Sequence, residues 1–134
     1  MTPADELRTA AARLRELAEH ATHENRPNWT TGNTLSSRTP VVVDHTEEPS
    51  VLVETYAARL EAVNRYIAAM DPALGAVLAD WLDQAARYYD AGVQAAADVF
   101  SDDPAGHEAF LTTGPGAPSE HALAVARQIN GSAP

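Results

Sequence analysis

The sequence contains neither cysteine nor lysine among its 134 residues. Without cysteine, disulfide bonds, thiolate metal ligands and a cysteine nucleophile are excluded. Without lysine, Schiff-base chemistry and the lysine-bearing phosphate loop are excluded as well. No run approaches the roughly 18 consecutive apolar residues of a membrane-spanning helix, and Met1–Glu6 lacks the basic and apolar character of a signal peptide. We therefore expect a cytoplasmic protein.

The charge is unbalanced, with 19 acidic residues against 9 arginines and a formal net charge of −10. Such a charge opposes direct binding to DNA, RNA or an anionic membrane, whose phosphates would repel the chain. Leu, Ile, Val and Phe are few, but abundant alanine at helical spacing argues for a folded chain with a thin core. The length suits one domain over residues 1–134.

Helix signals recur along the chain. Thr2-Pro3, Asp71-Pro72 and Asp103-Pro104 each place an N-cap residue before a proline at the first helical position. Ser119 and Gly131 are the expected cap residues of a last helix. Apolar residues at spacings of three and four fill the segments between these caps. The sequence predicts helices over about 3–21, 56–70, 72–100, 104–111 and 119–130.

The segment 28–55 differs, because it is rich in Pro, Thr, Ser and Asn. Val41–Val43 is a β-branched run typical of a strand, and 51–55 would pair with it as a hairpin. Residues 51–55 could instead begin the following helix, since the helical spacing extends through them. We favour the hairpin, which predicts a helix-dominant α+β fold of three to four main helices with a minor two-stranded hairpin. An all-α fold is the alternative, and 112–118 is expected to be a linker.

Three segments resemble small proteins of actinobacteria and their phages. They are TPADELRTAAARLRELAEHAT, YIAAMDPALGAVLADWLD and EHALAVARQINGS, which together cover about half of the chain. The resemblance implies a leading helix, an extended middle with a tryptophan, a Met-Asp-Pro helix junction and a closing helix. The chain departs from that pattern where His23–Arg26 separates Thr22 from Pro27. The group has no established activity, so the resemblance implies fold and host range only.

No motif predicts a catalytic residue, a cofactor or a metal. His20, His23 and Glu24 come closest to a metal site, but their order matches neither zinc-protease pattern. Histidine near a helix C-terminus is better explained by the helix dipole and solvent.

An acidic stripe on the long helix comprises Asp80, Asp83, Asp90 and Asp98. Carboxylates on one helix face could imitate a phosphate backbone and occupy the basic groove of a nucleic-acid-binding protein. The simpler interpretation is a solvated helix face, because Arg87 interrupts the stripe.

The aromatic residues of the same helix divide into two groups. Trp81 and Tyr89 fall on the apolar side, which predicts that they belong to the core. Tyr88 falls at the edge of that side and is the expected partner contact.

Taken together, these features predict a small acidic accessory or regulatory protein that binds another macromolecule, most simply a protein. An acidic inhibitor that mimics nucleic acid is the first alternative. An enzyme whose site is assembled across the fold is the second. Alanine-rich helix faces would also allow two copies to pack as a homodimer.

Overall fold

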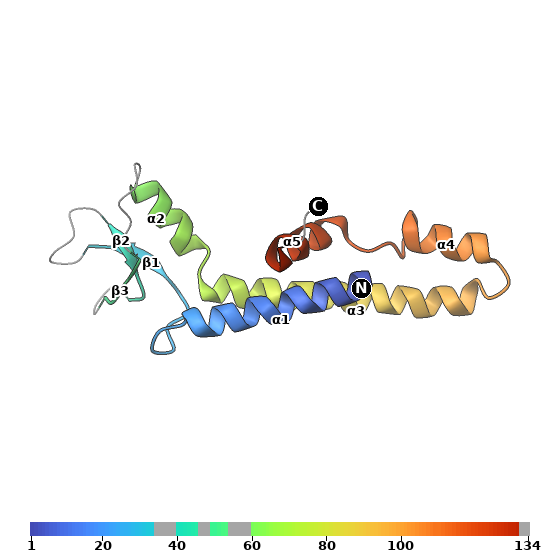
Figure 1. Cartoon of the computed structure of the whole chain (residues 1–134), viewed down its shortest axis with the longest axis horizontal. Coiled ribbons are helices and arrows are strands. Elements are labelled where there is room, and N and C mark those ends of the chain that lie inside the picture. Colours follow the sequence, from blue (N-terminus) through green and yellow to red (C-terminus); the bar gives the residue numbers. More distant parts are fainter. Residues whose placement is uncertain (34–39, 46–48, 54–59, 132–134) are drawn as a thin grey trace. The chain divides into compact units, whose positions relative to one another are not determined.

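The computed structural model describes residues 1–33, 40–45, 49–53 and 60–131. Within these ranges the chain forms five helices and a small three-stranded sheet, so the helix-dominant α+β prediction is confirmed (Figure 1). The elements are α1 (Pro3–Ala21), β1 (Thr30–Gly32), β2 (Val41–Val43), β3 (Val51–Val53), α2 (Leu60–Ala69), α3 (Pro72–Val99), α4 (Pro104–Thr112) and α5 (Glu120–Asn130). None of these helices combines the length and apolar character needed to cross a membrane.

The residues group into two compact units. Unit 1 comprises Met1–Leu14 and Leu78–Pro134, and unit 2 comprises Arg15–Val77. Helices α1 and α3 therefore each contribute residues to both units. The single domain expected from chain length stays a prediction.

The predicted caps are confirmed. At the start of α1, the Asp5 amide donates to Oγ1 of Thr2 and the Thr2 amide donates to Oδ2 of Asp5, both at 3.1 Å. This reciprocal pair is a capping box. The Thr2 hydroxyl also donates to Oδ2 of Asp5 (2.8 Å), and this bond, together with that from the Thr2 amide, holds the pKa of Asp5 below its usual value. The carboxylates of Asp71 and Asp103 accept the amide hydrogens three residues later, as N-caps do. At the ends of α5, Ser119 accepts from the Ala122 amide and Gly131 adopts the left-handed conformation.

The core of unit 1 is built from alanine and leucine on three helices. Its buried members are Ala4, Leu7, Ala10 and Ala11 of α1, Ala79, Leu82 and Ala86 of α3, and Ala122, Leu123 and Ala126 of α5. Alanine adds little bulk to a helix surface, so the three backbones can approach closely. Hydrogen bonds from Arg127 and Asn130 of α5 to Glu6 of α1 join two of these helices at their polar margin. The hydrogen bond from Arg127 also lowers the pKa of Glu6.

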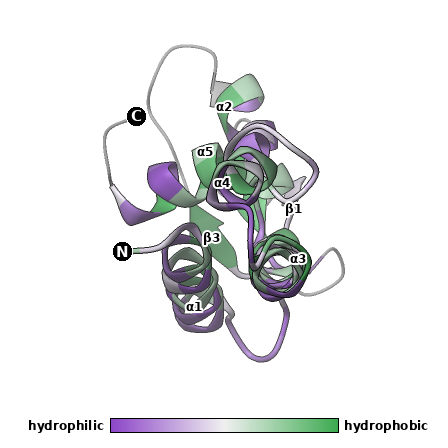
Figure 2. Ribbon diagram, turned by 90° about the vertical axis from the view of Figure 1, so that its right-hand side faces the viewer, coloured by the Kyte–Doolittle hydropathy of each residue, from purple (hydrophilic) through white to green (hydrophobic). Residues whose placement is uncertain are grey.

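Unit 2 contains the antiparallel sheet, in the order β1-β2-β3. The strands β2 and β3 form a hairpin, which confirms the predicted pairing, and a bulge lies between Val42 and Val43. All three residues of β3 are hydrophobic (Figure 2). The prediction of only two strands is wrong, because Thr30–Gly32 pairs with β2 on its other edge. That segment consists of threonine and glycine, so it lacks the alternation of hydrophobic and polar residues that predicts a strand. The predicted start of the second helix near residue 56 lies outside the described residues.

Helix α2 packs against β1 and β2, and the three valines of β2 are buried. Two polar side chains, Asp44 and Asn64, are also buried in this unit. Nδ2 of Asn64 donates to the carbonyl oxygen of Pro40 (2.9 Å) and so joins α2 to the start of β2. The Trp29 amide donates to Oδ2 of Asp71 (3.0 Å), which ties the chain before β1 to the start of α3.

Candidate binding groove

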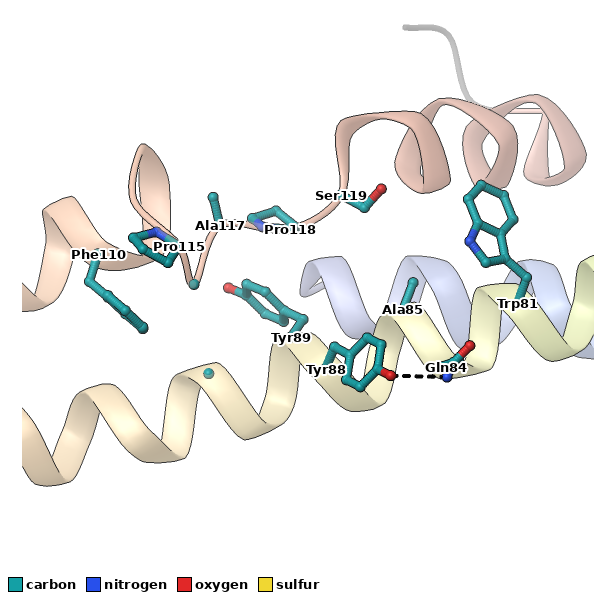
Figure 3. A pocket seen from close by; sticks show the side chains of 12 residues that line it. Trp81, Gln84, Ala85, Tyr88, Tyr89, Phe110, Pro115, Ala117, Pro118 and Ser119 are labelled. Atoms are coloured by element: carbon teal, nitrogen blue, oxygen red, sulfur yellow. Dashed lines mark hydrogen bonds between the residues drawn. The ribbon is translucent and has the colours of Figure 1, made fainter.

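A groove of about 350 Å³ lies within unit 1, between α3 and the segment that joins α4 to α5. From α3 it is lined by Trp81, Gln84, Ala85, Tyr88, Tyr89 and Gly92, and from the other side by Phe110 and Pro115–Ser119 (Figure 3). Four of these twelve residues are aromatic and two are proline. We refer to this site as the aromatic groove.

The helical positions of α3 explain the inner wall. Ala79, Leu82 and Ala86 are fully buried at spacings of three and four, so they define the core-facing side. Trp81, Ala85 and Tyr88 also follow one another at spacings of four and three, but their stripe lies beside the buried one. This neighbouring stripe lines the groove.

The prediction that Trp81 belongs to the core is therefore wrong. Its exposed fraction is 37%, whereas the neighbouring Leu82 is fully buried. Alanines 79 and 86, rather than the large aromatic residue, mark the buried side of α3. Tyr89 is half-buried and packs against the core cluster while also lining the groove, so its predicted core role is confirmed in part.

Tyr88 is exposed, as expected, with an exposed fraction of 69%. Nε2 of Gln84, one turn earlier, donates to the Tyr88 hydroxyl oxygen (3.1 Å) (Figure 3). That hydrogen bond orients the ring and leaves the tyrosine's own hydroxyl hydrogen available to an acceptor. A large aromatic ring carrying a free polar group is typical of binding surfaces.

The outer wall is the segment expected to be a simple linker. It is packed rather than free, because Gly116 is buried and its amide donates to the Phe110 carbonyl oxygen (3.1 Å). A Cβ atom on Gly116 would lie 2.3 Å from Cε1 of Phe110, so only glycine lets the segment pass this ring. The Phe110 ring in turn packs against Phe100, with 5.6 Å between ring centroids. The outer wall is thus fixed by contacts within α4 and its flanking segments.

The acidic stripe is partly neutralised within unit 1. Arg8 of α1 forms an ion pair with Asp90, which is half-buried, and this contact raises the pKa of Arg8. Asp80 and Asp83 also have interaction partners, whereas Asp98 is exposed. The stripe is therefore less uniform than a phosphate backbone.

A second polar site lies in unit 2, around the buried carboxylate of Asp44. It accepts hydrogen bonds from Nδ1 of His23 and from the Ser50 amide, both at 3.0 Å, and a guanidinium nitrogen of Arg26 lies 3.7 Å away. The hydrogen bond from His23 is the main reason why the pKa of Asp44 lies below its usual value. His23 and Arg26 belong to a tight turn in which Glu24 and Asn25 have positive φ.

An Asp–His pair of this kind orients a general base in hydrolases, but such a site also requires a nucleophile at the imidazole. The contacts of Asp44 instead connect the turn after α1 to both strands of the hairpin. His23 contacts Asp44 rather than joining His20 and Glu24 in a ligand set. Across the described ranges, no three histidine or acidic side chains converge closely enough to hold a metal ion.

Comparisons with protein-family models, curated proteins and solved structures found no match to this chain. The resemblance to actinobacterial and phage proteins stays a prediction from the sequence.

Proposed function

We propose that this protein binds another macromolecule through the aromatic groove of unit 1. The observation that carries the proposal is the exposure of Tyr88 and Trp81 beside a well-packed core. Burying a large apolar side chain is worth about 1.5–3 kcal/mol, so a partner that covers these two neighbouring rings together would gain binding free energy.

Several features of the groove support binding rather than catalysis. Aromatic side chains form much of its walls, and the polar side-chain groups that line it are an amide, the indole N–H of tryptophan, two hydroxyls of tyrosine and one of serine. Neither a carboxylate nor an imidazole is among its lining residues. Such a surface can bury area and direct hydrogen bonds, which is how aromatic hot spots contribute to interfaces.

Site-specific crosslinking would test this proposal. A photoreactive amino acid in place of Gln84 would stand in the groove, and the same amino acid in place of Tyr66 would stand on an exposed surface of unit 2. Irradiation of native cells should yield a crosslinked partner from position 84 and not from position 66. Identical products from both positions, or none from position 84, would contradict the proposal.

A further inference from the structure

The partner's chemistry can be narrowed from the shape of the aromatic groove, on the assumption that the proposed function holds. We infer that the groove binds an extended, proline-containing segment of a partner protein that also carries basic residues. The inference rests on the spacing of the aromatic rings, the depth of the groove and the charge of unit 1.

The spacing of the rings fits a polyproline II helix. Trp81 and Tyr88 leave α3 seven residues apart, which is about 10.5 Å along a helix axis. A polyproline II helix repeats every three residues, or about 9.3 Å. Ala85, which lies between the two aromatic residues, contributes only a methyl group to the groove (Figure 3). Successive repeats of a segment that runs along α3 can therefore contact first the Trp81 ring and then the Tyr88 ring.

The polar groups of the inner wall suit the backbone of such a segment. A polyproline II helix has no internal hydrogen bonds, so its carbonyl oxygens need donors from outside. The Tyr88 hydroxyl accepts from Gln84 and so has its own hydrogen to donate. Proline-binding grooves in general combine aromatic ridges with such donors.

The depth of the groove argues against an enclosed small molecule. Sites for small ligands bury most of the ligand surface, whereas Tyr88 is 69% exposed and Trp81 37% exposed. A shallow surface of this kind gains contact area only from an occupant that runs along it. An extended chain does so without having to fold first, and polyproline II loses little entropy on binding.

The negative charge of unit 1 favours a positively charged occupant of the groove. Unit 1 holds ten acidic side chains against four arginines, so arginine or lysine beside the prolines would be attracted and nucleic acid repelled. A second copy of this chain would carry the same negative charge. Its own Pro115-Gly116-Ala117-Pro118 segment is already packed into the outer wall.

Titration of the full-length ¹⁵N-labelled protein with synthetic peptides tests the inference. The probe is a twelve-residue peptide with two Pro-x-x-Pro repeats and an arginine at each end. Three matched peptides replace the prolines with alanine, replace the arginines with glutamate, or form a basic amphipathic helix of equal charge. The two tryptophan indole signals report separately, because Trp81 lies in the groove and Trp29 lies in unit 2.

At millimolar peptide, the Pro-x-x-Pro probe should move the Trp81 indole signal and leave that of Trp29 in place. The alanine and glutamate peptides should each bind at least about tenfold more weakly, a loss of about 1.4 kcal/mol. Tyr88→Ala should weaken binding of the Pro-x-x-Pro probe by a similar factor, while Tyr66→Ala should leave its affinity unchanged. Added salt should reduce the affinity.

If the alanine peptide binds as tightly as the Pro-x-x-Pro probe, the inference is overturned, because binding would then depend on charge alone. Preferential binding of the helical peptide, or concentration-dependent self-association that moves the Trp81 signal, would overturn it as well. In either case a crosslinked partner at position 84 would leave the proposed function standing. If no peptide moves the Trp81 signal and no partner is crosslinked at position 84, both proposals fail.

Discussion

The two units of this protein bury different kinds of residue. In unit 1 the buried hydrophobic residues are alanines and leucines on three helices. In unit 2 three valines of β2 are buried together with the carboxylate of Asp44 and the amide of Asn64. Unit 1 thus has an apolar core with its ion pairs, such as Glu6–Arg127, at the margin, whereas unit 2 places a carboxylate inside its buried set. This difference implies that single substitutions and acid should affect the two units differently.

The largest effect is expected in the core of unit 1. Leu82→Ala should lower the free energy of unfolding by about 2–5 kcal/mol, because it leaves a cavity between three helices. Trp81→Ala, one residue earlier, should cost only about 1–2 kcal/mol, since the ring is partly exposed and already adjoins solvent. Urea denaturation of both variants would measure this difference. A larger loss for Trp81→Ala than for Leu82→Ala would show that the buried side of α3 is assigned wrongly.

In unit 2, Asp44→Asn should lower the free energy of unfolding by about 1–3 kcal/mol, because it replaces a carboxylate that accepts hydrogen bonds from His23 and Ser50.

The pH dependence of this contribution follows from the direction in which the pKa of Asp44 is shifted. A carboxyl with a lowered pKa in the folded state stabilises the fold above its unfolded pKa, and this contribution is lost as pH falls through the folded pKa. The stability difference between wild type and Asp44→Asn should therefore shrink on acidification below the usual aspartate range. A difference that stays constant down to that pH would contradict a role for the Asp44 charge.

Two glycines of the groove offer a finer comparison. Gly116→Ala should destabilise the outer wall by about 1–3 kcal/mol, because the added Cβ collides with the Phe110 ring. Gly92→Ala should be neutral or stabilising by up to about 1 kcal/mol, because its Cβ meets Gly116 at an ordinary 3.5 Å and alanine favours the helix. Melting temperatures of the two variants, compared with that of the wild type, would show which substitution is the more destabilising. Equal destabilisation would indicate that the segment 115–119 does not pack against α3 as described.

The smallest effect is expected on the acidic stripe. Changing Asp80, Asp83, Asp90 and Asp98 together to Asn should leave the fold intact and change the free energy of unfolding by about 1 kcal/mol or less, because an ion pair as open to solvent as Arg8–Asp90, with nearly half of each side chain exposed, contributes little. Partner affinity should fall less in this variant than in Tyr88→Ala. A complete loss of binding, with DNA competing for the same partner, would favour nucleic-acid mimicry.

Local signals made most of unit 1 predictable. The capping pairs at Thr2, Asp103 and Ser119 each act within three residues, so these helix boundaries could be inferred without knowing what packs where. In unit 2, comparable signals came from the Asp71 cap and the valine run. β1 has no apolar pattern and becomes a strand through its pairing with β2, which depends on tertiary structure.

The candidate site was only partly predictable. Exposure of Tyr88 followed from its place on the helix, but Trp81 was misplaced because its hydrophobicity outweighs the weak signal of the alanines that mark the buried side. The outer wall could not be predicted, since Phe110 and Pro115–Ser119 reach the groove only when α4 folds back along α3. A Pro-Gly-rich segment gives the same sequence pattern whether it is packed or free.

Measuring the affinity of the crosslinked partner for two matched variants tests the central claim most directly. Tyr88 and Tyr66 have the same exposed fraction, 69%, but only Tyr88 lines the groove. Tyr88→Ala should weaken binding by at least about tenfold, as expected for an aromatic hot spot, while Tyr66→Ala should leave it within about twofold of wild type. Equal losses in the two variants, or a loss in Tyr66→Ala alone, would contradict the assignment of the aromatic groove as the binding surface.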